Sequence, residues 1–207
     1  MKTYPVTTVV NHDLEQMKSI AEWEKRVGYH EAFKIKSESC RIGDGLHAMA
    51  EYLLDDNWDE IRRLMKDPDV HPTSKKLIPQ IFDFCEVNLG KTLFTEKDIV
   101  CEELGLHGRF DALIETPDGD IAIVDWKNSK KPKKLEHCQN YIKQATCYAM
   151  MLELEHDIVV DKYAIVIATQ SDGLQIISDT FGESHYEAAM KRIEEYFQFR
   201  IEEDGEY

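Results

Sequence analysis

The spacing of apolar residues changes from helical to strand-like near residue 92, and this change constrains the fold more than any other feature. From Thr92 onward, segments rich in Ile and Val have the pattern of strands: "LFTEKDIVCEEL", "GRFDALIE", "DIAIVDWK", "KYAIVIAT" and "LQIISDTF". A helix, "HCQNYIKQATCYAMMLELEH", separates the third from the fourth. We therefore expect an α/β fold with a central mixed sheet flanked by helices.

Helical patterns dominate the first 91 residues. Apolar spacing predicts helices over residues 13–27, 42–54, 58–65 and 74–88, and a last helix over residues 184–202. The first of these has a partly amphipathic face made by Leu14, Met17, Ile20, Ala21 and Trp23. We expect residues 1–91 to form an N-terminal helical part and residues 92–207 to form the core that contains the sheet, packed as one compact domain.

Composition excludes several classes of protein. No apolar run approaches the roughly 20 residues of a membrane span, and the N-terminus "MKTYPVTTVVNHDLEQ" resembles neither a signal nor a transit peptide, so we expect a cytoplasmic protein. The five cysteines lack C-x-x-C spacing and predict reduced thiols without structural zinc. The net charge of −15 argues against a nucleic-acid partner unless the basic residues cluster. They do cluster, because five lysines lie within residues 127–134.

The side chains of Asp111, Asp125 and Lys127 would meet on one face of the sheet if the turn between their strands is centred on Asp118. Asp125 and Lys127 alternate with Trp126, so they point to the same face of their strand. The turn "TPDGD" predicts a hairpin, and a centre at Asp118 would put Asp111 opposite Asp125. Paired carboxylates suit Mg²⁺ or Mn²⁺, and a neighbouring lysine can orient water and stabilise a phosphorane-like transition state. A one-residue slip would break this arrangement. The alternative is an exposed hairpin with solvated or ion-paired side chains.

The segment "GRFDALIETPDGDIAIVDWKNS" resembles the G-x-x-D…D-W-K-T-S core of the PD-(D/E)xK nuclease superfamily. It is most similar to the RecB-like exonuclease branch, which includes mitochondrial genome maintenance exonucleases and phage or CRISPR-associated exonucleases. "RIGDGLHAMAEYL" resembles that branch's G-x-x-x-H helix through Gly43 and His47, and "QATCY" its Q-x-x-x-Y motif through Gln144 and Tyr148. The order of elements also agrees, and the resemblance covers about residues 41–169.

The resemblance implies a restriction-endonuclease-like fold and a role for each matching residue. Asp111, Asp125 and Lys127 would be catalytic. His47, Asp111, Asp125 and the carbonyl of Trp126 would hold Mg²⁺ or Mn²⁺, and an imidazole ligand favours Mn²⁺ without excluding Mg²⁺. By itself, His47 would be interpreted as a hydrogen-bonded helix histidine, and its position beside Gly43 and the Asp-Trp-Lys strand reverses that interpretation.

The remaining motif residues have less defined roles. Gln144 and Tyr148 share a helix face, and the resemblance makes them contacts to nucleic acid or supports for the site; the alternative is a tyrosine at the edge of the core with its amide neighbour. Glu102 and Glu103 could add an acid near the metal, but a solvated strand end explains them as well. Some relatives hold an iron–sulfur cluster with a C-terminal cysteine group. This chain has no cysteine after Cys147, so we expect none.

The lysine-rich segment gains a role from its position directly after the catalytic strand. Lys130, Lys131, Lys133 and Lys134 would bind backbone phosphates, unless the segment is only a solvated loop. We expect a metal-dependent deoxyribonuclease, foremost an exonuclease on single-stranded or end-bearing DNA in replication, repair or recombination. The alternatives are a structure-specific endonuclease and a non-cleaving DNA-binding accessory protein. The sequence lacks a G-x-x-x-x-G-K-[ST] motif, so unwinding would need a helicase partner.

Overall fold

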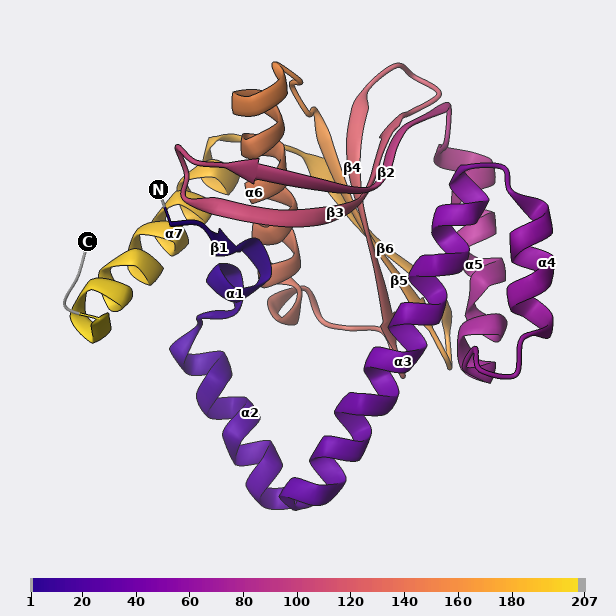
Figure 1. Ribbon diagram of the computed structural model, residues 1–207, viewed down its shortest axis with the longest axis horizontal. Coiled ribbons are helices and arrows are strands. Elements are labelled where there is room, and N and C mark those ends of the chain that lie inside the picture. Colours follow the sequence, from indigo (N-terminus) through magenta and orange to yellow (C-terminus); the bar gives the residue numbers. More distant parts are fainter. Residues whose placement is uncertain (1, 205–207) are drawn as a thin grey trace.

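A computed structural model describes residues 2–204 of the protein, so Met1 and residues 205–207, at the outer ends of the two expected parts, lie outside it. Its centre is a mixed six-stranded sheet of order β1-β3-β4-β5-β6, in which β2 pairs with β3 (Figure 1). The strands are β1 (Tyr4–Pro5), β2 (Lys91–Cys101), β3 (Leu106–Glu115), β4 (Ile121–Ser129), β5 (Lys162–Thr169) and β6 (Gly173–Thr180). The α/β fold class predicted from the sequence is confirmed.

The helices cover both faces of this sheet. They are α1 (Val6–Asn11), α2 (Leu14–Val27), α3 (Tyr29–Leu54), α4 (Trp58–Lys66), α5 (Pro72–Asn88), α6 (Gln139–His156) and α7 (Glu183–Asp204), with a short 3₁₀ helix at Leu135–His137. A first core, between the sheet and α1, α6 and α7, includes Val9, Leu113 and Ile165. A second core, between the sheet and α3, α4 and α5, includes Leu46, Ile81 and Trp126 (Figure 1).

The β3–β4 hairpin has the register that the turn predicts. Ala112 pairs with Val124, and Glu115 pairs with Ile121, so the hairpin is centred on Asp118. Asp111 and Asp125 occupy the next position beyond the last pair of the ladder. The predicted opposition of the two carboxylates is therefore confirmed as a matter of register.

The longest helix departs from the sequence prediction. We expected a helix over residues 42–54, whereas α3 extends over Tyr29–Leu54. Gly28, with φ of 89°, is the only break between α2 and α3, and residues 29–41 contain neither Gly nor Pro that would interrupt a helix. The added turns form one continuous rod with the part of the helix that carries His47.

The apolar face of α2 is exposed, although an amphipathic pattern usually marks a face that packs against a core. Leu14, Met17 and Ile20 are exposed, and no residue of α2 is buried. Figure 1 shows α2 and the first half of α3 as two arms that project from the body of the protein and meet at their turn. A periodic apolar face predicts a helix, but here it packs against neither core.

The segment before α2 belongs to the body of the protein, which the sequence pattern did not reveal. β1 pairs with the start of β3, and Val6, Val9 and Val10 of α1 are buried in the first core. Arg192 of α7 donates to the carbonyl oxygen of His12 (2.6 Å) and forms an ion pair with Asp13 (3.0 Å). These contacts join the two ends of the described chain. Within residues 2–204, no helix has the length and apolar character needed to cross a membrane.

Candidate active site

A groove of about 590 Å³ lies where α3 passes the carboxyl end of β4. α3 contributes Gly43 and His47, β2 contributes Glu96, and β4 contributes Trp126 and Lys127. A Cβ atom on Gly43 would lie 3.2 Å from the side-chain amide of Asn128 in β4. The missing side chain therefore lets the helix pass close to the strand, which explains the glycine of the G-x-x-x-H motif.

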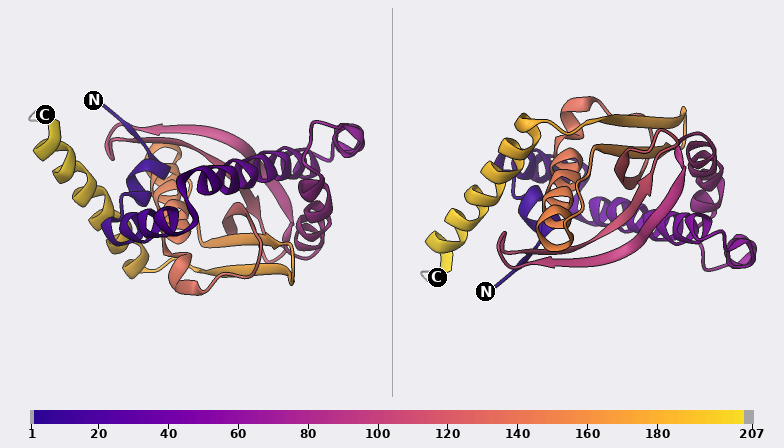
Figure 2. Two further views of the ribbon diagram at one scale, coloured as in Figure 1. Left: turned by 90° about the horizontal axis from the view of Figure 1, so that it is seen from below. Right: turned by 90° about the horizontal axis from the view of Figure 1, so that it is seen from above.

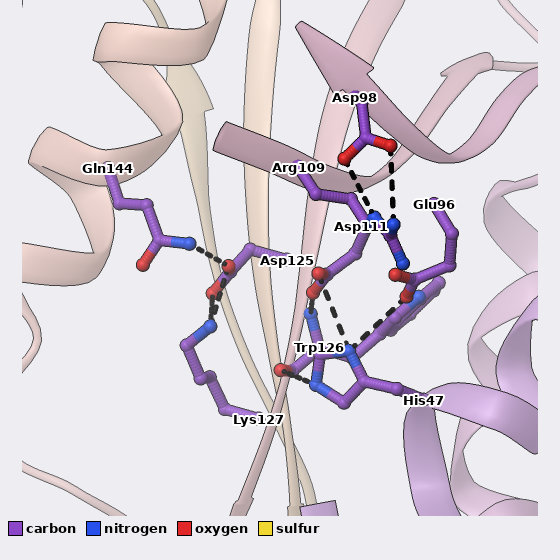
Figure 3. A network of polar contacts seen from close by, with 9 residues as sticks. All are labelled: His47, Glu96, Asp98, Arg109, Asp111, Asp125, Trp126, Lys127 and Gln144. Carbon is purple, nitrogen blue, oxygen red and sulfur yellow. Dashed lines mark hydrogen bonds and ion pairs between the residues drawn. The ribbon is translucent and has the colours of Figure 1, made fainter. Parts of the chain in front are cut away.

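One wall of the groove brings an imidazole and two carboxylates together (Figure 3). His47 Nδ1 lies 3.4 Å from Asp111 Oδ1 and 3.5 Å from Glu96 Oε1. The three residues each offer a donor atom within 4.8 Å of the others. On the other side of the ring, His47 Nε2 lies 2.9 Å from the carbonyl oxygen of Trp126. The backbone N–H of Trp126 donates to Asp111 Oδ2 (2.7 Å), which fixes the carboxylate in place.

The second acid of the hairpin has different partners. Lys127 Nζ donates to Asp125 Oδ1 (2.6 Å) and lies equally near Asp125 Oδ2. Gln144, which reaches the site from α6, donates to Asp125 Oδ1 (3.1 Å). Asp125 and Gln144 are buried, and the Lys127 side chain is one-fifth exposed. Asp125 thus holds Lys127 at the groove, and Gln144 in turn holds Asp125 in position.

Burial and neighbouring charges shift the pKa of each titratable group. Burial opposes the charge of His47, but the carboxylates of Asp111 and Glu96 outweigh it and raise the pKa of the imidazole from 6.5 to about 10. Burial also acts to raise the pKa of Asp111, yet the charge of His47 holds it below its ordinary value. Burial raises the pKa of Asp125 to about 6. For Lys127, the nearby carboxylates outweigh burial and raise its pKa, so the ammonium stays charged.

The donor set fits a divalent cation. Carboxylate oxygens with one imidazole suit Mg²⁺ or Mn²⁺. Glu96 Oε1 is buried without an aligned hydrogen bond and faces His47 Nδ1 at 3.5 Å, whereas Asp125 Oδ2 is already held by the Lys127 ammonium at 2.6 Å. Once His47 loses its proton, a cation or water would have to satisfy Glu96 Oε1. His47, Glu96 and Asp111 are therefore the best-placed ligands, whereas the ligand roles of Asp125 and of the Trp126 carbonyl remain predictions.

The structure places the other predicted residues close to the site or beside it. Gln144 and Tyr148 are both buried, and the Tyr148 ring packs edge-on to Phe110. A Cβ on Gly108 would lie 2.5 Å from the Tyr148 hydroxyl, so this glycine of the hairpin motif makes room for the tyrosine. Their burial favours a supporting role over direct contact with nucleic acid.

The predicted phosphate-binding lysines follow β4 in a loop, which we call the lysine loop (residues 130–134). Lys130, Lys131 and Lys134 are exposed, and Lys134 lies 3.4 Å from the exposed Glu136. Lys133 is half-buried, with its ammonium 5.7 Å from the centre of the Tyr141 ring. The ammonium of Lys127 lies over the same ring at 5.2 Å. One aromatic ring therefore joins the lysine loop to the groove.

Glu96 is the site residue that the sequence analysis missed. We considered Glu102 and Glu103, which are exposed residues at the turn between β2 and β3. The pairing of Cys101 with Leu106 sets the register of that hairpin, and counting back along it places Glu96 opposite Asp111. Glu96 also has φ of 42°, a left-handed conformation that is unusual within a strand. Recognising "LGLHG" as the end of a tight turn would have provided the signal.

Comparisons with known proteins agree with this geometry. A search of curated protein sequences gives no match. Among solved structures, the chain is similar to a proposed exonuclease from Eubacterium rectale, with 16% identity and a TM-score of 0.55 over 82% of this chain and 69% of that one. It is also similar to the protein SSO0001, with 16% identity and a TM-score of 0.51 over 97% and 77% of the two chains. At these identities, both likenesses show the fold alone.

The family model of the PD-(D/E)XK nuclease superfamily matches residues 11–195, nearly the whole sequence, and the chain therefore belongs to this superfamily.

Proposed function

We propose that the protein is a divalent-metal-dependent deoxyribonuclease, an exonuclease that hydrolyses phosphodiester bonds in single-stranded or end-bearing DNA. The observation that carries the proposal is the groove itself. It gathers a three-residue ligand set (His47, Glu96 and Asp111) and, beside it, a charged lysine held by Asp125. Membership of the nuclease superfamily supports the reaction class, and the surfaces around the groove support the proposed substrate.

The chemistry divides among a few side chains. A divalent cation, when bound, would lower the pKa of a water molecule and neutralise charge on the scissile phosphate. Lys127 faces the groove as an ammonium and can stabilise the negative charge that develops on the phosphoryl oxygens. Asp125 holds this ammonium in position at 2.6 Å, and Gln144 restrains Asp125 in turn. Asp111 and Glu96 orient His47, whose other nitrogen is fixed by the Trp126 carbonyl.

A single face of α3 extends the groove toward the tip of the two arms. At alternating steps of four and three residues, this face carries Tyr29, Phe33, Lys36, Cys40, Gly43 and His47. The 18 residue steps from Tyr29 to His47 rise about 27 Å along the helix axis. Tyr29 and Phe33 are 66% and 69% exposed, although large aromatic rings are usually covered. Exposed rings on a track toward the metal ligands suit the stacking of unpaired bases.

The charge along this track differs from the rest of the chain. Residues 14–41 carry six Lys and Arg against five Asp and Glu, whereas the whole chain carries 25 against 40. The lysine loop adds four more cations beside the groove. A polyanion is therefore repelled by most of the surface and tolerated along the arms and the lysine loop, which favours one path for the strand.

The proposal is tested with a linear single strand labelled at either end and a closed single-stranded circle of the same sequence. We expect the wild type to degrade the linear strand in Mn²⁺ or Mg²⁺ and to leave the circle intact, with no cleavage in EDTA. Lys127→Ala should be inactive, whereas Lys191→Ala, which alters an exposed lysine on α7, should cleave normally.

Each other outcome identifies a different function. Cleavage of the circle would show an endonuclease on the same core. Binding of the single strand without cleavage in either metal would show a DNA-binding accessory protein. Preferential cleavage of an RNA strand of equal length would change the substrate class.

A further inference from the structure

A second groove, of about 490 Å³, lies at the other end of the sheet, between α5 and β6. It opens where the last turn of α5 leaves the sheet uncovered, near the amino ends of β4 and β5. Its lining combines apolar and polar side chains, and the apolar Val87 and Ile176 are 72% and 45% exposed. The apolar part of the lining includes Phe84 and Val87 from α5, Ile176 from β6, and Ile114, Ala122 and Ala164 from the floor of the sheet.

The groove runs beside an open edge of the sheet. β6 is the last strand in the sheet order, and β5 is its sheet neighbour within residues 2–204. Gln175 points to the opposite face, where its amide bonds to the backbone N–H (2.8 Å) and carbonyl (2.7 Å) of Lys133. Ile176 and Ser178 alternate with it and line the groove. Ile176, Ser178 and Thr180 are exposed, and β6 lies at the margin of the molecule in Figure 2.

Acidic residues surround this groove. Lys162, the lysine in its lining, is ion-paired with Asp120. Asp118 and Asp161 lie within electrostatic range of the same ammonium, so three carboxylates face one cation. Asp83 is exposed on α5, one turn before Val87. The rim is therefore net negative around an apolar floor.

We propose that this groove and the edge of β6 dock an extended segment of a partner protein that carries an apolar residue flanked by Lys or Arg. The segment would pair with the open backbone of β6 as an added strand, which supplies main-chain hydrogen bonds. An apolar side chain would fill the groove between Val87 and Ile176, and flanking cations would face Asp83 and Asp118. The apolar floor favours an apolar side chain, the open edge of β6 favours an extended backbone, and the acidic rim favours flanking Lys or Arg.

The same features disfavour other occupants. A nucleic-acid strand would meet the acidic rim, and a second copy would bring an equally acidic rim against it. Lys127 lies five residues beyond Ala122, which is in this groove, and this corresponds to about 17 Å along β4. A docked segment therefore leaves the catalytic groove free, so the surface serves to tether the enzyme.

The test uses a random twelve-residue peptide library displayed on phage and selected on the immobilised full-length protein. We expect the enriched peptides to combine apolar residues with Lys or Arg. Fluorescently labelled copies should bind the wild type and lose affinity by at least tenfold in Val87→Lys and in Ile176→Lys. Val100→Lys makes the same valine replacement at an exposed position near the far end of β2 and should bind as the wild type does.

Two further measurements connect binding to this surface. Bound peptide should slow hydrogen exchange at the amides of residues 176–180. Asp83→Asn combined with Asp118→Asn should weaken binding and flatten its salt dependence while leaving the thermal unfolding temperature unchanged. The proposal is overturned by a failure to enrich any peptide, by acidic or uncharged consensus sequences, or by unchanged binding in Val87→Lys. A wild-type dimer in sedimentation that becomes monomeric in Val87→Lys would instead assign the groove to a second copy.

Discussion

Binding of a divalent cation should release one proton from His47 near neutral pH. The carboxylates of Asp111 and Glu96 raise the pKa of the metal-free imidazole to about 10. Below that pH, the ring carries a proton on both nitrogens, one facing Trp126 O and the other facing the two acids. A cation held by His47 needs a free lone pair on the ring, so the proton must leave. Affinity should then rise about tenfold per pH unit between pH 6.5 and 8.5.

The raised pKa of His47 also determines how the stability of the metal-free protein changes with pH. Because the folded pKa of His47 lies above its ordinary 6.5, the metal-free protein has the full stabilisation below pH 6.5 and loses it as pH rises through 10. A shift from 6.5 to about 10 corresponds to at most about 5 kcal/mol. The metal-bound protein should lack this decline, since its imidazole is already neutral. Asp125, whose pKa is raised to about 6, is ionised at pH 7.5 and adds little to the proton count there.

Calorimetry in buffers of different ionisation enthalpy measures the released protons directly. We expect about one proton per Mn²⁺ for the wild type at pH 7.5, close to zero for His47→Gln, and the wild-type value for His30→Gln. His30 is an exposed histidine on the same helix and provides a matched control. A wild-type value near zero, or an unchanged value in His47→Gln, would refute the reasoning and leave His47 as a hydrogen-bonded helix histidine.

Three other predictions follow from the geometry. Lys127→Ala should slow cleavage at least a hundredfold, the scale of a lost electrostatic stabiliser, at an unchanged unfolding temperature; activity within about tenfold of wild type contradicts this role. Replacing the four lysines of the lysine loop with Ala should flatten the plot of log affinity against log salt by about 0.7 per lost phosphate contact and spare turnover at saturating DNA; a wild-type slope would place the strand elsewhere. Gly108→Ala should cost about 1–3 kcal/mol in chemical unfolding, because its Cβ would lie 2.5 Å from the Tyr148 hydroxyl, and Tyr148→Phe should recover part of that loss; additive losses would argue against a clash.

The hairpin part of the site could be predicted from the sequence because its geometry is local. The turn at Asp118 sets the register, and two-residue alternation then places Asp111 opposite Asp125 and aligns Lys127 with it. The strand boundaries were also close, since β5 coincides with its predicted segment. Short-range periodicity and one turn contain all of this information.

Features that depend on tertiary contacts were not predictable in the same way. The position of Glu96 depends on the register of a second hairpin and on a left-handed backbone conformation. The apolar side chains of α2 and of the first turns of α3 satisfy the periodic pattern of a packed helix, yet they project from the body. Residues 4–11 are too short for a periodic signal, and only their contacts with β3, α6 and α7 place them in the first core.

The joined ends of the described chain affect when a newly synthesised molecule can become active. A ribosome-bound chain that has emerged through residue 180 contains every candidate catalytic and ligand residue. It nevertheless lacks α7, whose Ala189 and Ile193 fill the first core beside Val6 and Val9. Arg192, which anchors the segment before α2, is also still missing. The candidate site therefore becomes fully supported only after α7 has also left the ribosome, well after the last of the candidate site residues has been synthesised.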